Sequence, residues 1–283
     1  VPISDARLRG TRAGNRILEL AGRIGGGEIP VFEQWIRVGD RPAWRADFAT
    51  GQQTDLSYFR RIPYLDVRTA GDHKRIWELN RHQHLVTLAQ AWVLSPDDAR
   101  YLAPLWRQLQ HWIADNPFQC GINWTSALEV AFRAWSWCWI WHLAGDRMPG
   151  ELRQAFLESL YRHGRHLAVN LSVYFSPNTH LLGEALVLAT LGHLFPAFPE
   201  AEEWRRLGGG IVRSQYRSQV AGDGSHIEQS SYYHVYALDM FLWFQVLEPP
   251  GAEERDVTDR MAEFLSALAG AQGRIPLLGD DDG

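Results

Sequence analysis

Residues 223–236 hold the densest group of side chains that can carry a proton. They run from a polar loop into the expected start of an apolar helix, and a helix start would fix such side chains on a rigid edge. A structural interpretation also stays open, in which Ser230 or Ser231 caps the helix while Tyr232 and Tyr236 pack inward at i,i+4 spacing. The candidate site residues of this group are His226, Glu228, Tyr233 and His234.

Residues 176–184 predict an anion site at the start of another helix. With Ser176 as the N-cap and a proline at the first helical position, Asn178 and His180 fall in the first turn. Exposed main-chain amides and the positive end of the helix dipole favour a bound carboxylate there. Glu184 follows one turn after His180, so it could orient the imidazole or merely form a surface pair with it.

A third group, in residues 77–84, offers hydrogen-bond donors at neighbouring helical positions. Asn80, Arg81 and His84 suit a carboxylate or a sulfate. The structural alternative is an ordinary solvated helix face. The pair His82 and His84 could also contact a metal, but without a clear third ligand we expect no metal site.

A fourth group lies in residues 123–137, an apolar segment in which Glu129 and Arg133 stand one turn apart. Charges on so apolar a helix need partners, so they either pair structurally or line a cavity. Trp124 opens the same segment. An indole offers a flat apolar face and a donor edge, which suits stacking on sugar rings and also suits helix packing.

Composition narrows the function classes further. The formal charge of −5 provides no bulk positive field that would gather nucleic acid or a polyanion, so any acidic ligand must be held by local basic groups. The sequence contains no Gly-rich phosphate loop, no nucleophile elbow and no paired-cysteine zinc signature. The first residues do not show the pattern of a signal peptide, which is also compatible with a leader that has been removed, and no segment is long and apolar enough to span a bilayer.

The four groups must be positioned by helices. Residues 1–72 are predicted to form an irregular N-terminal extension with one helix near residues 5–24, and residues 273–283 read as a glycine-rich, acidic boundary segment. Between them, short connectors with Pro, Gly and Asp predict antiparallel helical hairpins. Helical apolar spacing covers residues 73–93, 97–115, 124–144, 150–169, 177–195, 200–220, 229–247 and 255–270.

Taken in this order, the four groups resemble the N-terminal helical domain of the heparinase II/III-like polysaccharide lyases, a family that includes heparin, heparan sulfate and alginate lyases. The resemblance spans most of the chain and rests on Ile76 to Arg81, Trp124 to Arg133, Ser176 to Leu181, Asp223 to His234 and Pro276 to Asp280. It implies an all-α fold, with an incomplete (α/α) toroid over residues 73–272. The family's C-terminal β-sheet domain would be absent from this chain.

The resemblance also implies a reaction, β-elimination on a uronic acid. The proton at C5 is removed, the glycosidic oxygen at C4 leaves, and charge builds on the adjacent carboxylate, which donors must neutralise in the transition state. Asn178, joined by His180, is expected to neutralise it, and Tyr233, at the family's motif position, is expected to serve as acid or base. His180 is an alternative base, and relatives supply a further histidine from the sheet domain.

We expect the remaining candidates to bind substrate: Asn80, Arg81, His84, Trp124, Glu129, Arg133, Glu184, His226, Glu228 and His234. The expected partner is an acidic polysaccharide, with no nucleic acid, no membrane and no required cofactor, although a divalent metal in the sheet domain is compatible with the resemblance. The expected location is the periplasm or the exterior of a bacterium, with the cytoplasm as the alternative.

Two other functions are compatible with the sequence. Helical toroids also carry glycoside hydrolases, which need two facing carboxylates, and Glu184, Glu228 and Asp223 are candidates for these. A non-catalytic glycan-binding module could instead use the 13 tryptophans of the chain for stacking.

Overall fold

The computed structural model describes residues 5–32, 34–39, 41–96 and 98–280, and the chain divides into two compact units. Unit 1 ends at His166 and unit 2 begins at Leu167, so the division falls inside the helix α8 (Gly150–Asn170). The boundary expected at residue 72 lies within unit 1, and the segment expected at 273–283 belongs to unit 2, with residues 281–283 outside the described part.

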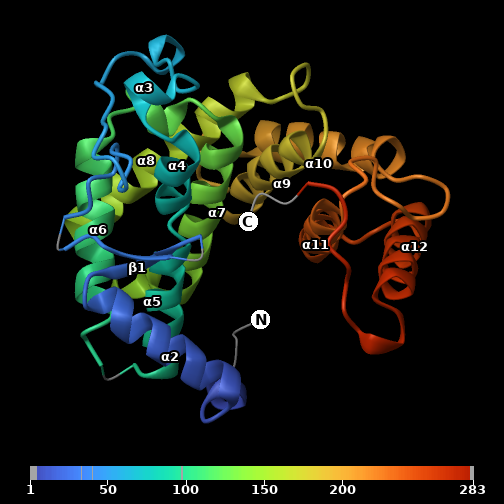
Figure 1. Cartoon of the computed structure of the whole chain (residues 1–283), viewed down its shortest axis with the longest axis horizontal. Helices are drawn as coiled ribbons and strands as arrows, with labels where there is room; N and C mark the ends of the chain where they lie inside the picture. Colours follow the sequence, from blue (N-terminus) through green and yellow to red (C-terminus); the bar gives the residue numbers. More distant parts are fainter. Residues whose placement is uncertain (1–4, 33, 40, 97, 281–283) are drawn as a thin grey trace. The chain divides into compact units, whose positions relative to one another are not determined.

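Unit 1 is mainly helical (Figure 1). Its strands, β1 (Glu28–Val31) and β2 (Gln34–Arg37), pair as an antiparallel hairpin inside the segment expected to be irregular; four-residue strands are too short for alternation to reveal. Its helices besides α8 are α1 (Asp5–Leu8), α2 (Arg12–Gly25), α3 (Val67–Ala70), α4 (His73–Asn80), α5 (Gln83–Leu94), α6 (Leu102–Asp115) and α7 (Ala127–Ala144), with 3-10 turns η1 (Phe59–Arg61), η2 (Ile122–Trp124) and η3 (Gly145–Arg147).

The single helix predicted over residues 73–93 is interrupted at His82. This residue has a φ of 62°, a left-handed backbone conformation that is uncommon for residues other than glycine. Its buried ring accepts a hydrogen bond from Trp137 Nε1 at Nδ1, over 2.9 Å. A tertiary contact therefore decides the break between α4 and α5, which is why apolar periodicity did not reveal it.

One main-chain carbonyl of the N-terminal segment is bonded to two helical elements at once. The oxygen of Trp44 accepts hydrogen bonds from Asn80 Nδ2, at 2.8 Å, and from Asn123 Nδ2, at 2.9 Å. All three residues are buried. Because a buried amide must be bonded, these contacts hold residues near 44 against α4 and η2.

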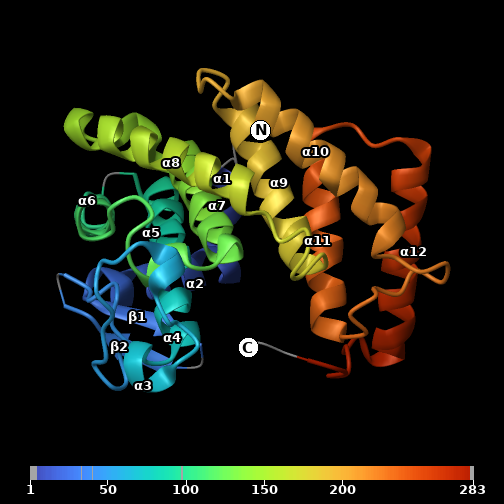
Figure 2. The same ribbon diagram turned by 90° about the horizontal axis from the view of Figure 1, so that it is seen from above.

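Unit 2 contains four long helices, and α9 packs against both α10 and α11, while α11 packs against α12 (Figure 2). Nearly every residue of α9 is buried, so it is the central helix of the unit. No helix in the described ranges of either unit could cross a membrane. The elements are α9 (Thr179–Leu194), α10 (Ala201–Ser218), α11 (Ser231–Leu247), α12 (Ala252–Ala269) and the 3-10 turn η4 (Gly270–Gln272).

The last described residues return to the start of α11. Ser231 N donates to Leu278 O at 2.9 Å, and Ser230 Oγ donates to Asp280 O at 2.5 Å. Two main-chain carbonyls thereby satisfy donors at the helix start. This part of the predicted boundary segment is thus bonded into unit 2.

Two glycines allow α9 and α10 to pack so closely that their main chains are in contact. A Cβ atom built on Gly208 would lie 2.4 Å from Ala185 O, and one on Gly192 would lie 2.3 Å from Ala201 O. Contacts this short are with main-chain atoms, which cannot rotate away. The central packing of unit 2 therefore depends on the absence of side chains at these two positions.

Gly208→Ala should consequently destabilise the chain by roughly 3 kcal/mol or more, because the added methyl forces the two helices apart. Gly210→Ala is the matched control on the same helix, since nothing lies within 4 Å of its Cβ position. The control should gain up to about 1 kcal/mol from helix propensity. Urea unfolding followed by circular dichroism measures both, and equal effects would refute the packing argument.

Candidate functional site

In unit 1 the structure brings the third and fourth predicted groups together through Arg81. Its Nε and Nη2 donate to the two carboxylate oxygens of Glu129, both at 2.8 Å, and its Nη1 lies 2.7 Å from Glu78 Oε2. The Arg81 side chain is 27% exposed, and that of Glu129 is 6% exposed. Arg81 is thus already paired with two carboxylates, while part of its side chain remains exposed.

Asn80 and His84 are buried and bonded to the protein itself. Asn80 accepts from Trp112 Nε1 at 2.7 Å and donates to two main-chain carbonyls. His84 Nε2 bonds Gln108 Oε1 at 3.0 Å, and burial lowers the pKa of His84 to about 4, so the ring is neutral at pH 7. This geometry supports structural roles, and substrate binding by these two residues stays a prediction.

Arg133 is completely buried without a carboxylate in hydrogen-bond contact among the described residues. Its Nε donates to His163 Nε2 and its Nη2 donates to Asn123 O, each at 2.9 Å. The guanidinium carbon also lies 4.3 Å from the ring centroid of Trp112 and 5.5 Å from that of Trp124. Burial lowers the pKa of Arg133 to about 9, and Glu129 opposes this, so the group keeps its charge at neutral pH.

The histidine beside Arg133 must be neutral. His163 Nε2 accepts from the guanidinium, so the ring proton sits on Nδ1, which donates to Ser159 O at 2.7 Å. Burial holds the pKa of His163 well below its usual range, and the charge of Arg133 adds to this. Trp124, predicted for sugar stacking, is 1% exposed and has ring contacts with His163. Arg133 and Trp124 therefore form part of the core, inaccessible to a polysaccharide in this structure.

No group of three or more His, Cys, Asp or Glu side chains in the described ranges could hold a metal ion. The rings of His82 and His84 lie 5.9 Å apart and nearly perpendicular. One ring nitrogen of His82 is hydrogen-bonded to Trp137, and one ring nitrogen of His84 is hydrogen-bonded to Gln108.

In unit 2 the structure brings the first and second predicted groups together. Glu228 accepts from Asn178 Nδ2 at 3.1 Å with one oxygen and from Thr179 N at 3.0 Å with the other. Asn178 Oδ1 in turn accepts from His180 N, so Asn178 is the N-cap and α9 starts at Thr179, two residues later than Ser176 and Pro177 predicted. The sequence predicts that this helix start binds the carboxylate of a ligand, but in the structure its donors are bonded to the protein's own carboxylate, Glu228.

A second set of hydrogen bonds, made by Gln219, holds Asn178 and His226 in place. Gln219 Nε2 donates to Asn178 O at 2.7 Å, while Gln219 Oε1 bonds His226 Nε2 at 3.0 Å. Burial lowers the pKa of His226 to about 4, and the neighbouring Glu228 opposes this shift. His226 is therefore neutral at pH 7 and carries its proton on Nε2, which the amide oxygen requires.

Tyr233 lies in the first turn of α11, where Ser230 is the N-cap and accepts from Tyr233 N at 3.2 Å. Of the two serines considered as the cap in the structural interpretation, Ser230 is the one that caps the helix. The inward packing of Tyr232 and Tyr236, which the same interpretation included, is not found: Tyr232 is 38% exposed and Tyr236 is only partly buried. The two rings stack with centroids 6.0 Å apart.

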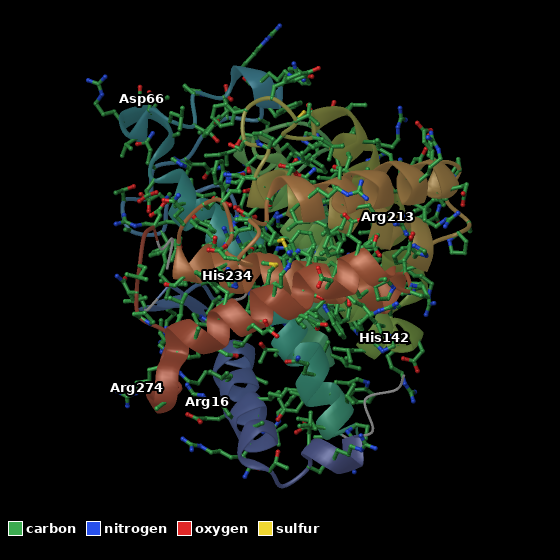
Figure 3. The ribbon with its side chains drawn as sticks, turned by 90° about the vertical axis from the view of Figure 1, so that its right-hand side faces the viewer. Arg16, Asp66, His142, Arg213, His234 and Arg274 are labelled. Carbon is green, nitrogen blue, oxygen red and sulfur yellow. The ribbon has the colours of Figure 1, made fainter. Side chains whose placement is uncertain are left out.

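His234, labelled in Figure 3, is buried and is hydrogen-bonded to α12. Its Nε2 donates to Met261 O at 3.0 Å, whereas its buried Nδ1 has no hydrogen-bond partner among the described residues. A cavity of about 180 Å³ lies beside it, and Phe264, Leu268 and Leu278 contribute apolar walls. Residues Ser225, His226, Gln229, Ser230, Ser231 and His234 complete the lining.

Glu184 is fully buried and accepts two hydrogen bonds from one residue. Ser172 N and Ser172 Oγ each donate to it at 2.7 Å. Burial raises the pKa of Glu184 to about 7, although both bonds to Ser172 act in the opposite direction. Because Glu184 belongs to the buried helix α9, its bonds to Ser172 connect the loop after α8 to the core of unit 2.

Two residues of this site were missed by sequence reasoning. Ser172 and Gln219 carry no motif, and each acts on a partner 12 or 41 residues away in the sequence. For Ser172, the available signal was the carboxylate of Glu184, which lies on an apolar helix and therefore needs a buried partner. Nothing in the sequence indicates the second.

Glu228→Gln should destabilise the chain by about 1–3 kcal/mol, because it replaces two charge-assisted bonds at the start of α9 with neutral contacts. Glu263→Gln, on the exposed side of α12, should change the free energy of unfolding by less than about 0.5 kcal/mol. Denaturant unfolding of the two variants at low salt checks this. A Glu228 variant as stable as the control would show that the carboxylate does not hold the helix start.

Glu184 predicts a pH effect of definite sign. Between pH 4.5 and about 7 the folded state keeps a proton that the unfolded state has lost, so its stability contribution falls as pH rises. The total loss should approach about 3 kcal/mol, at about 1.4 kcal/mol for each pKa unit. Glu184→Gln cannot titrate, so the stability difference between parent and variant should change across this window. A difference independent of pH would contradict the raised pKa.

Comparison with known proteins places these observations in a family. Residues 44–256 match the family model described as heparinase II/III N-terminus. The chain is 28% identical over 192 residues to a heparin-sulfate lyase of Bacteroides stercoris, covering 60% of this chain and 28% of the lyase. It is 30% identical over 173 residues to a heparin-sulfate lyase of Bacteroides thetaiotaomicron, covering 56% and 23% respectively.

Solved structures agree at the level of fold. A crystal structure of heparinase III aligns with a TM-score of 0.66 and 19% identity, covering 93% of this chain and 40% of that one. The heparan sulfate lyase HepC from Pedobacter heparinus aligns with a TM-score of 0.64 and 19% identity, covering 88% and 38%. The chain thus spans well under half the length of these proteins, and its all-α fold is that of their helical toroid domain. On the match over residues 44–256, the chain belongs to the heparinase II/III family.

Proposed function

We propose that this chain is the helical part of a polysaccharide lyase that cleaves a uronate-containing glycosaminoglycan by β-elimination. The proposal is supported by relatives that are heparin-sulfate lyases. The observation that carries it is the Asn178 amide, held at the start of α9 by Glu228. A substrate carboxylate would lie against the same helix start.

Asn178 has the chemistry to neutralise developing charge. One Nδ2 proton goes to Glu228, and an amide nitrogen carries two, so the second proton is directed at a position fixed by the first bond. A donor oriented before the reaction stabilises the transition state without reorganisation. His180, in the first turn of α9, is the proposed second group at the substrate carboxylate or the base.

Tyr233 is the proposed proton carrier. A phenol with a pKa near 10 is a poor base at neutral pH but a suitable donor to the leaving C4 oxygen. Its main-chain N–H is bonded to Ser230, which sets the start of α11, and Ser230 is bonded in turn to Asp280 O. The first turn of α11, which carries Tyr233, is therefore held by hydrogen bonds to Ser230 and, through Ser230, to Asp280.

Partners and location complete the proposal. The substrate is an acidic polysaccharide, and Arg81, whose side chain is 27% exposed, is one basic group of the predicted set that is not fully buried. We expect no cofactor in this part of the protein; a divalent metal in the family's sheet domain is compatible with the proposal. The expected location is the bacterial periplasm or the exterior.

Tyr233→Phe should reduce the rate of elimination by about 100-fold or more while leaving the fold intact, because general acid–base catalysis is worth about that much. Tyr232→Phe is the matched control and should keep the parent rate. The assay follows the near-ultraviolet absorbance of the unsaturated uronate produced from heparan sulfate by the full-length protein. A reducing-end signal without this absorbance would instead indicate a hydrolase.

A further inference from the structure

Two neighbouring aromatic side chains in unit 2 are almost fully exposed. Tyr174 is 97% exposed and Phe175 is 90% exposed, whereas the next most exposed aromatic residue in the described ranges, Tyr58, reaches 45%. Aromatic surface left in water contributes nothing to the stability of the folded chain. A pair of this kind therefore indicates a binding role rather than a packing role.

The turn that carries this pair is fixed at its base. Ser176 N donates to Ser172 O at 3.4 Å, which closes the segment 172–176 into a turn. Ser172 N and Oγ are both bonded to the buried carboxylate of Glu184 at 2.7 Å. The two rings are thus presented by a turn that is anchored to the central helix of unit 2.

The same turn leads directly to the proposed carboxylate site. Only two residues separate Phe175 from Asn178, so three Cα–Cα steps of about 3.8 Å place their Cα atoms within about 11 Å of each other. A short oligosaccharide spans such a distance. A pyranose ring combines an apolar C–H face with polar edges, which matches aromatic rings followed by an amide.

The dimensions of the pair favour a sugar over a protein partner. Two aromatic side chains supply roughly 150–250 Å² each, whereas a stable protein interface needs about 800 Å² on each side. Val173, at 42% exposure, is the immediate apolar neighbour in the turn. The patch is therefore of the size of one or two stacked rings.

We propose that Tyr174 and Phe175 form a stacking platform for sugar rings that flank the uronate bound at Asn178. The ligand class rests on the proposed function, whereas the platform itself rests on exposure and anchoring. Because the platform contacts sugars beside the reacting one, it contributes to affinity and leaves proton transfer unchanged. Loss of the rings should raise KM and affect kcat little.

The test measures binding of heparan sulfate oligosaccharides by calorimetry, with Tyr233→Phe present in every protein so that turnover does not interfere. Tyr174→Ala and Phe175→Ala should each weaken binding roughly fivefold to tenfold, and more together. The paired variant Tyr174→Trp with Phe175→Trp should retain affinity, since stacking is preserved. Val246→Ala, which alters a 70% exposed residue of α11, is the control and should bind like the parent.

The outcomes separate the two proposals. Alanine variants that bind within twofold of the parent overturn the platform, and so does a parent that binds none of these oligosaccharides. If the alanine variants lose affinity but the unaltered full-length protein forms no unsaturated product, the platform stands and the proposed reaction fails. If elimination occurs with unchanged KM after both aromatic rings are removed, the reaction stands and the platform fails.

Discussion

The first turn of a buried helix leaves main-chain donors that must find acceptors, and this requirement organises unit 2. At the start of α9 the acceptor is Glu228, which lies about 50 residues further along the sequence and binds both Asn178 and Thr179. The bond ties the loop before α11 to the central helix. Gln219 reinforces the junction from the end of α10. Three helices are thereby held together at the point where the proposed chemistry takes place.

In unit 1 the buried group that must find partners is a charged side chain, the guanidinium of Arg133. Arg133 is buried among indoles and bonded to a neutral imidazole and a carbonyl, so its positive charge is spread over aromatic faces rather than paired with a carboxylate. Removing water from an unpaired charge is costly, and the surrounding polar contacts have to offset it. This explains why His163 must stay neutral, since a second cation at 2.9 Å would be strongly repelled.

Helical periodicity was sufficient to predict most of unit 2, because α9 to α12 are long, continuous and separated by proline or glycine. The break at His82 was not predictable, since it depends on a ring contact with Trp137, 55 residues away. For the site, the sequence identified Asn178 and Glu228 as polar residues near helix starts. It could not show that they bind one another, because pairing over 50 residues is decided by how the helices pack.

The position of Glu228 places an electrostatic condition on the proposed reaction. A uronate carboxylate that approaches the start of α9 meets a fixed negative charge, and like charges at short distance disfavour ionisation of both. Asn178 is neutral, and His226, with its pKa lowered to about 4, cannot supply a positive charge at pH 7. The network formed by Asn178, Glu228, His226 and Gln219 can orient the substrate but cannot by itself neutralise a dianionic transition state. A cationic group beyond this network is therefore required for elimination.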